Sequence, residues 1–246
     1  MSRNRIVDIA LIIIFYIGVS TFPTGLITNN PYIYYGVEIA LYVACLLFII
    51  LYGRRQEGLI QKFPRMNLYN FFLLLPVVVI CISNFIYAWS FKEAFEPRFD
   101  YSDILAVIHI ILVVIVEELI FRHILIANLE HDNKLIRIVI SAGVFALCHI
   151  THFLSSFNPA DLVIIVYTFG LGLVLGFMYC YGNCLYACMG LHFLFNLCND
   201  FLFERLYYVN NTLWYFLINI FVAVAMGLYI FAIYMLQLRK NPAELD

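Results

Sequence analysis

The chain has 246 residues, of which 64% are hydrophobic and only 12% are charged. A soluble domain has roughly 45–50% apolar and about 25% charged residues, so this composition excludes a soluble globular enzyme and a disordered chain. The net charge is −2 and no basic stripe is present, so we expect no nucleic-acid partner. Long unbroken apolar runs differ from the short alternating segments of a membrane β-barrel. The composition therefore predicts an all-α, polytopic membrane protein embedded in the lipid bilayer.

Eight apolar runs follow one another along the chain, and each is close to the length of about 20 residues that a transmembrane helix needs. Together they use most of the chain, so we expect one integral membrane domain over residues 1–246 and no soluble domain. The runs cover residues 6–22, 32–52, 68–90, 104–126, 135–154, 161–181, 184–200 and 213–236.

Lys and Arg are concentrated in every second loop, whereas the loop at 91–103 is acidic. Because cytoplasmic loops of membrane proteins carry an excess of Lys and Arg, both termini are predicted to be cytoplasmic. Abundant Ile, Phe, Tyr and Asn are typical of an AT-rich genome, and we expect a multi-pass protein of a bacterial plasma membrane. The basic residues of these loops and of the two termini are Arg3, Arg5, Arg54, Arg55, Lys62, Arg65, Lys134, Arg137, Arg239 and Lys240.

The fourth apolar run contains three charged residues, Glu117, Glu118 and Arg122. Charged side chains inside a membrane are costly and mark candidate functional sites by default. Glu118 and Arg122 are four residues apart, so they share one face of a helix. A structural ion pair needs only one carboxylate, and the second Glu therefore indicates more than a structural role.

Two further runs carry polar residues at the same helical spacing, His149 four residues after Phe145 and Asn196 four residues after His192. A helix bundle can bring such groups together in its interior. Two Glu, two His, one Asn and one Arg are the parts of a general acid–base site with an oxyanion stabiliser. Each group alone is also explained by packing, an ion pair or an interhelical hydrogen bond. Their joint occurrence favours a site.

These motifs resemble those of the CAAX protease and bacteriocin-processing family, also called CPBP or Abi, which includes type II CAAX prenyl endopeptidases. Glu117-Glu118-Leu-Ile-Phe-Arg122 is similar to the EExxxR motif of the family. Phe145-Ala-Leu-Cys-His149 is similar to its FxxxH motif, and His192-Phe-Leu-Phe-Asn196 to its HxxxN motif. The glycine-rich stretch at 169–176 is similar to the helix that precedes the third motif.

The resemblance covers residues 104–200, which we expect to be the catalytic core, with 1–103 and 201–246 as additional transmembrane helices and loops. One departure is His123, because the family often has Gly after the Arg of the first motif. That position is not a catalytic one.

The resemblance implies a CAAX-type intramembrane endopeptidase that hydrolyses a peptide bond in a membrane protein or peptide precursor. It implies that the first Glu and the FxxxH histidine activate water. The His and Asn of the third motif would stabilise the oxyanion, while the second Glu completes the acidic pair and the Arg anchors it. The candidate catalytic residues are Glu117, Glu118, Arg122, His149, His192 and Asn196.

Two Glu and two His could also bind zinc. However, the sequence lacks HExxH, and Phe121 rather than His stands three residues after Glu118, so the Glu-x-x-His motif of di-iron bundles is absent as well. We therefore expect no cofactor and a metal-independent, glutamate-type site, with zinc as the less favoured alternative. The seven cysteines lack a CxxC spacing and are expected to be small buried apolar residues.

Two other functions compete with proteolysis. A non-catalytic membrane partner could confer bacteriocin-type immunity or regulate a membrane sensor, with the motif residues acting as a polar lock. A small transporter could use Glu117 and Glu118 as a proton relay, but no inverted repeats are visible.

Helix rise of about 1.5 Å per residue puts Glu117 about 20 Å below the outer edge of a roughly 30 Å apolar core. This predicts a site that opens toward the cytoplasm. Glu38 and His109 are polar groups inside spans without an assigned partner, and we expect structural roles for both. Gly172 and Gly176 form a GxxxG pattern that lets a neighbouring helix approach closely.

Overall fold

The computed structural model describes residues 3–56, 59–60, 77–151, 161–182, 184–210 and 212–240. The fold is all-α, as predicted, apart from one pair of two-residue strands. The α-helices are α1 (Arg3–Ser20), α2 (Thr24–Ile27), α3 (Pro31–Arg55), α5 (Val77–Cys81), α6 (Ser83–Phe91), α7 (Asp103–Glu118), α8 (Lys134–Cys148), α10 (Asp161–Gly182), α11 (Leu185–Phe195), α12 (Phe203–Leu206) and α13 (Thr212–Lys240). Two π-helical segments, η1 (Leu119–Ile126) and η2 (Asn196–Leu202), continue α7 and α11, and the strands are β1 (Ala94–Phe95) and β2 (Tyr207–Tyr208).

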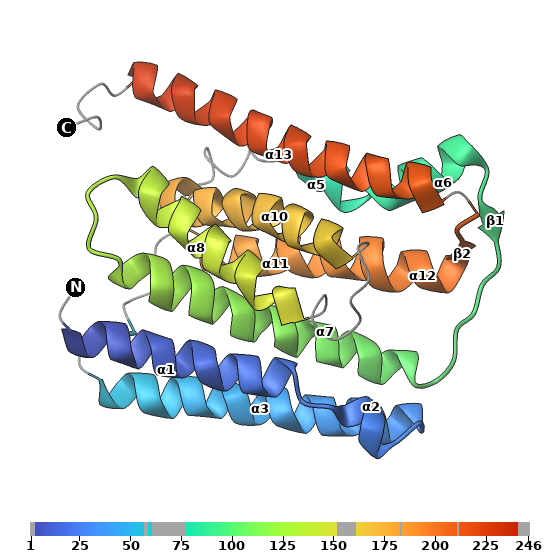
Figure 1. Ribbon diagram of the computed structural model, residues 1–246, viewed down its shortest axis with the longest axis horizontal. Helices are drawn as coiled ribbons and strands as arrows, with labels where there is room; N and C mark the ends of the chain where they lie inside the picture. Colours follow the sequence, from blue (N-terminus) through green and yellow to red (C-terminus); the bar gives the residue numbers. More distant parts are fainter. Residues whose placement is uncertain are drawn as a thin grey trace.

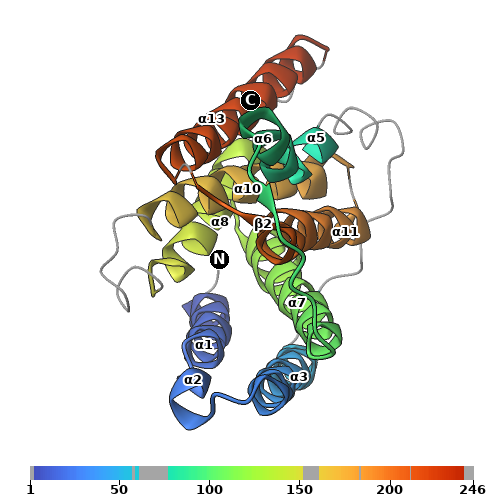
Figure 2. The ribbon, with the colours of Figure 1, turned by 90° about the vertical axis from the view of Figure 1, so that its right-hand side faces the viewer.

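The long helices lie side by side along the long axis of the molecule (Figure 1). The pair α1 and α3 forms one edge, and α13 with α5 and α6 forms the opposite edge, as the end-on view also shows (Figure 2). Between these edges lie α7, α8, α10 and α11, which carry all three motifs. The motif helices therefore occupy the middle of the bundle, where polar side chains can be kept away from lipid.

Within the described residues, five helical segments are long and apolar enough to cross a membrane, and the predicted number of eight is not confirmed. The apolar run at 68–90 lies partly outside the described residues. The helix α8 has 15 residues, a length of about 22 Å that is shorter than the roughly 30 Å apolar core, and α11 has 11 before it continues as η2. The five segments are 5–27, 31–55, 103–126, 164–182 and 212–233.

The basic helix ends lie together at one end of the bundle. In Figure 1, α1 and α8 begin, and α3 and α13 end, at the end where both chain termini are marked. These helix ends carry most of the predicted cytoplasmic Lys and Arg residues, while Lys62 and Arg65 lie outside the described residues. The charge asymmetry thus coincides with one end of the fold, and the cytoplasmic location of this end stays a prediction.

At the opposite end of the bundle, a short strand pair and an ion pair join segments that are far apart in the sequence. The strand β1 pairs antiparallel with β2, and Ala94 lies opposite Tyr208. Arg205 donates from Nε to Asp103 at 2.9 Å, which ties the start of α7 to α12. These contacts fix the N-terminal end of α7 relative to the C-terminal part of the chain.

The predicted close approach at the GxxxG pattern is confirmed. A Cβ atom added at Gly172 would lie 3.0 Å from both Cα and Cβ of Ala142 in α8, and one at Gly176 would lie 3.0 Å from Cγ2 of Ile138. A side chain at either position would push α10 away from α8. Since α8 carries Phe145 and His149 follows its last residue, the two glycines set the distance between these site residues and α10.

Candidate active site

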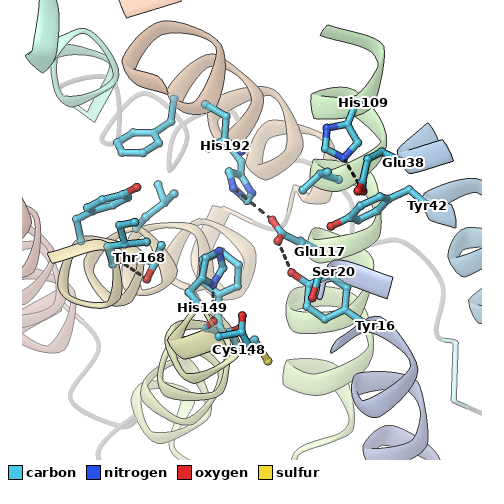
Figure 3. A pocket seen from close by; sticks show the side chains of 18 of the residues that line it. Tyr16, Ser20, Glu38, Tyr42, His109, Glu117, Cys148, His149, Thr168 and His192 are labelled. Carbon is cyan, nitrogen blue, oxygen red and sulfur yellow. Dashed lines mark hydrogen bonds and ion pairs between the residues drawn. The ribbon is translucent and has the colours of Figure 1, made fainter. Parts of the chain in front are cut away.

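A cavity of about 390 Å³ lies among six helices in the middle of the bundle. Four of the six predicted site residues line it, namely Glu117, His149, His192 and Asn196. Figure 3 shows Glu117, His149 and His192 directed toward the same space from α7, the end of α8 and α11. Residues from three motifs that are far apart in the sequence are therefore brought to one cavity.

Glu117 is held from two sides. Its carboxylate accepts a hydrogen bond of 2.5 Å from the hydroxyl of Tyr16 in α1. Its other oxygen, Oε2, lies 3.6 Å from Nε2 of His192. The side chain is only about 4% exposed, yet it lines the cavity (Figure 3). A buried carboxylate that is oriented by neighbours and reaches a cavity is the arrangement expected for a general base.

Glu118 and Arg122 lie behind this cavity and do not line it. Nη1 of Arg122 lies 3.2 Å from Oε1 of Glu118, and both side chains are almost completely buried. The guanidinium also lies over the ring of Phe145, 4.6 Å from its centroid. The ion pair therefore lies within the first motif, and the cation–π contact of Arg122 joins this motif to the second.

His192 connects the two glutamates. Its Nδ1 lies 2.8 Å from Oε1 of Glu118, while its Nε2 faces Glu117 and the cavity. We assign the proton on Nδ1 to the hydrogen bond with Glu118, because an ionised carboxylate only accepts. A carboxylate on one ring nitrogen fixes the orientation of the ring and leaves the other nitrogen for chemistry, as in a catalytic triad.

Phe145 packs against both histidines of the site. Its ring packs edge-to-face against His149 with centroids 4.8 Å apart, and against His192 with centroids 5.8 Å apart. Nδ1 of His149 lies 2.9 Å from the backbone carbonyl oxygen of Phe145, and the His149 side chain lines the cavity. The Phe of the second motif is thus a packing centre for Arg122, His149 and His192.

Both π-helical segments begin at site residues. The segment η1 follows Glu118 directly, and η2 begins at Asn196, which lines the cavity. π-helical turns are rare and occur frequently at functional sites. Here they change the helical register at the two points where motif residues face the cavity.

Sequence reasoning missed Tyr16 and assigned no partner to Glu38 and His109. Tyr16 is one of 18 tyrosines, and its contact with Glu117 joins residues 101 positions apart, so no local spacing indicates it. Oε2 of Glu38 lies 3.7 Å from Nε2 of His109, and both side chains line the same cavity as Glu117 (Figure 3).

The cavity extends toward the end of the bundle opposite the termini. On α7 it is lined by His109, Val113 and Glu117, all at or before the first motif Glu. The residues that follow, from Ile120 to Ile126 in η1, are all buried in the packed interior. The predicted opening toward the cytoplasm is therefore incompatible with the predicted cytoplasmic termini. The depth count alone could not detect this, because packing beyond Glu117 closes the nearer end.

His123, the residue that departs from the family pattern, lies in the packed interior outside the cavity. The side chain is completely buried, and its Nδ1 lies 3.3 Å from the hydroxyl of Tyr179. It does not line the cavity, so the departure leaves the site unchanged.

The described helices and the buried polar cavity define a multi-pass membrane protein with a Glu/His site. Residues 102–198 match the model of a protein family described as type II CAAX prenyl endopeptidase Rce1-like. The matched segment is less than half of the chain and contains all six predicted site residues, and the resemblance read from the three motifs is confirmed over it. This family is one of membrane proteases. A search of curated proteins finds no match for the chain.

Proposed function

We propose that the protein is an intramembrane endopeptidase that hydrolyses a peptide bond in a membrane-associated protein or peptide precursor. The observation that carries this proposal is the convergence of Glu117, His149, His192 and Asn196 on one cavity. We place the catalytic core in residues 104–200, with 1–103 and 201–246 as the surrounding helices. The contact from Tyr16 makes α1 part of the site although α1 lies outside the matched segment.

In the proposed reaction, Glu117 accepts a proton from a water molecule in the cavity, and the His149 side chain, which lines the same cavity, orients this water. The resulting hydroxide attacks the carbonyl carbon of the scissile bond, and a C–O bond forms. The carbonyl oxygen becomes an oxyanion that accepts hydrogen bonds from the Nε2 proton of His192 and from the Asn196 amide. Glu117 then gives its proton to the leaving nitrogen, and the C–N bond breaks.

The charges of the buried groups support this assignment. Two carboxylates, Glu117 and Glu118, face one guanidinium from Arg122, which leaves one negative charge. Donation from His192 to an oxyanion requires protons on both ring nitrogens, and such an imidazolium balances that charge. Its Nδ1 proton is held by Glu118, and its Nε2 proton lies between Glu117 and the cavity.

We propose that this chemistry needs no metal. Within the described part of the chain, no group of three or more His, Cys, Asp or Glu is arranged to hold a metal ion. The test is dialysis of the purified protein against a strong chelator, after which we expect activity to be retained. Complete loss that zinc restores would contradict a metal-independent mechanism.

The experiment that tests the proposed function compares membrane peptides by mass spectrometry from cells that express the wild type or Glu117→Ala. We expect at least one precursor to accumulate, and its cleavage product to disappear, only with the variant. A matched control is Glu96→Gln, which changes an exposed carboxylate outside the cavity. Identical peptide profiles, with an immunity or sensor phenotype that Glu117→Ala retains, would favour a non-catalytic membrane partner.

A further inference from the structure

Beyond the motif residues, the cavity contains a second charged group. Glu38 in α3 is 7% exposed and lines the cavity together with His109 in α7. Neither residue belongs to the matched family motifs, and the proposed hydrolysis uses neither. Figure 3 shows the pair on the same side of the cavity as Tyr42, above Glu117.

The environment of Glu38 does not compensate a full negative charge. A buried carboxylate is costly unless it is hydrogen-bonded or paired with a positive charge. The separation of 3.7 Å from Nε2 of His109 exceeds a normal hydrogen bond, and this nitrogen has no hydrogen-bond partner among the described residues. The described polar groups that interact with Glu38 besides His109 are hydroxyls, those of Thr24, Tyr34 and Tyr42, and none of them carries a positive charge.

Aromatic rings surround the pair. Tyr42 packs edge-to-face against His109 with centroids 5.2 Å apart, and Tyr34 lines the same part of the cavity. Carboxylate oxygens combined with aromatic faces form a site that favours a cation, because both attract positive charge. An acidic group would be repelled by Glu38.

We propose that Glu38, with His109 and the neighbouring tyrosines, forms a subsite that binds a Lys or Arg side chain of the peptide substrate. This inference rests on the proposed endopeptidase function and adds a specificity for a basic residue. His109 and Glu117 are eight residues apart in α7, which corresponds to about 12 Å along the helix. An extended peptide spans about 3.3–3.6 Å per residue, so the basic residue lies about three to four positions from the cleaved bond.

The test uses the full chain, purified in lipid nanodiscs, and a pool of apolar twelve-residue peptides with acetylated and amidated ends. Each peptide carries one Lys at a different position, and its matched control carries norleucine there. Mass spectrometry gives the cleaved bond and the relative kcat/KM. We expect Lys three or four positions from that bond to raise kcat/KM at least tenfold over norleucine. Glu38→Gln should abolish this preference, whereas Glu38→Asp and Glu96→Gln should keep it.

Equal cleavage of the Lys and norleucine peptides by the wild type would overturn the subsite, as would a preference that persists in Glu38→Gln. Unblocked norleucine peptides with a free terminal amine form a further arm. If the free terminal amine raises kcat/KM as much as a Lys side chain does, the subsite binds a terminal amine and the proposed side-chain specificity is wrong.

A binding arm separates this inference from the proposed function. The Glu117→Ala protein and its Glu38→Gln double variant are titrated with fluorescent versions of the same peptides. Tighter binding of the Lys peptides that requires Glu38 supports the subsite even if no peptide is cleaved by the wild type, an outcome that would count against the endopeptidase. Equal binding of the Lys and norleucine peptides contradicts the subsite whether or not cleavage occurs.

Discussion

His192 and Glu118 are joined by a buried contact of 2.8 Å between Nδ1 and Oε1, which links the third motif to the first across 74 residues of sequence. This contact gives the two adjacent glutamates separate tasks in the proposed mechanism. Glu118 orients the imidazole and pairs with Arg122, and Glu117 is left to face the cavity. One carboxylate could not both pair with His192 and Arg122 and face the cavity, because these partners and the cavity lie on different sides of the helix.

Replacing Arg122 by Lys should damage activity although the positive charge is kept. The guanidinium contacts Glu118 and lies over Phe145, and an ammonium group cannot reproduce the planar, delocalised cation that makes both contacts. A buried cation–π contact contributes about 1–2 kcal/mol, so we expect a fall of about 5- to 30-fold in kcat/KM. The measurement is peptide cleavage by the purified variant. Wild-type activity of Arg122→Lys would show that charge alone is sufficient.

Replacing Tyr16 by Phe should lower kcat while KM stays close to the wild-type value. The change removes only the hydroxyl that donates to Glu117, so it disturbs the orientation of the base rather than substrate binding. A hydrogen bond to a charged group contributes about 1.5–3 kcal/mol, which corresponds to a loss of about tenfold or more in kcat. Tyr101→Phe is the control, because Tyr101 is exposed and does not line the cavity. Equal effects of the two variants on kcat would exclude a specific role of Tyr16.

The all-α fold and the contacts within one helix could be predicted from the sequence, whereas the contacts between helices could not. Helical spacing of four residues correctly placed Glu118 with Arg122 and Phe145 with His149, because these are local contacts. The contact of Tyr16 with Glu117 could not be predicted, because it depends on how α1 packs against α7.

The number of eight spans is not confirmed, and the direction of the cavity could not be predicted, for a related reason. Apolar runs mark residues that avoid water, but within the described residues the run at 135–154 contains an α8 of only 15 residues. Likewise, counting residues gives the depth of Glu117 but does not reveal which end of the cavity is filled by neighbouring side chains. Both properties are set by packing between helices.

Replacing Gly172 by Ala should destabilise the protein. The added Cβ would lie 3.0 Å from the backbone of Ala142, so α10 and α8 must move apart. Overpacking of this kind costs about 1–3 kcal/mol. The measurement is the Tm of the purified variant in detergent. Gly143→Ala is the control, because a Cβ there meets no atom within 4 Å, and its Tm should not fall. A Tm of Gly172→Ala at or above the wild-type value would contradict the close packing.

Single-cysteine labelling should place the cavity and the chain termini on opposite sides of the membrane. On a cysteine-free background, we expect Gln56→Cys to react only with reagent inside the cell and Glu96→Cys only with reagent outside. Thr151→Cys lines the cavity and should follow Glu96→Cys. Reaction of Gln56→Cys from outside with protection of Glu96→Cys would reverse the orientation. Reaction of Thr151→Cys together with Gln56→Cys would disprove the direction of the cavity.

In the proposed reaction, Glu117 drives the hydrolysis of a peptide bond by water. The most direct measurement incubates purified wild type and Glu117→Gln with a cleavable membrane peptide in water enriched in ¹⁸O and analyses the products by mass spectrometry. We expect one ¹⁸O atom in the new carboxyl group with the wild type, and a loss of at least about 10² in rate with Glu117→Gln, the size of effect known for the loss of a general base or an oxyanion donor. Wild-type turnover by the Glu117→Gln variant, or products without ¹⁸O, would contradict the proposed reaction.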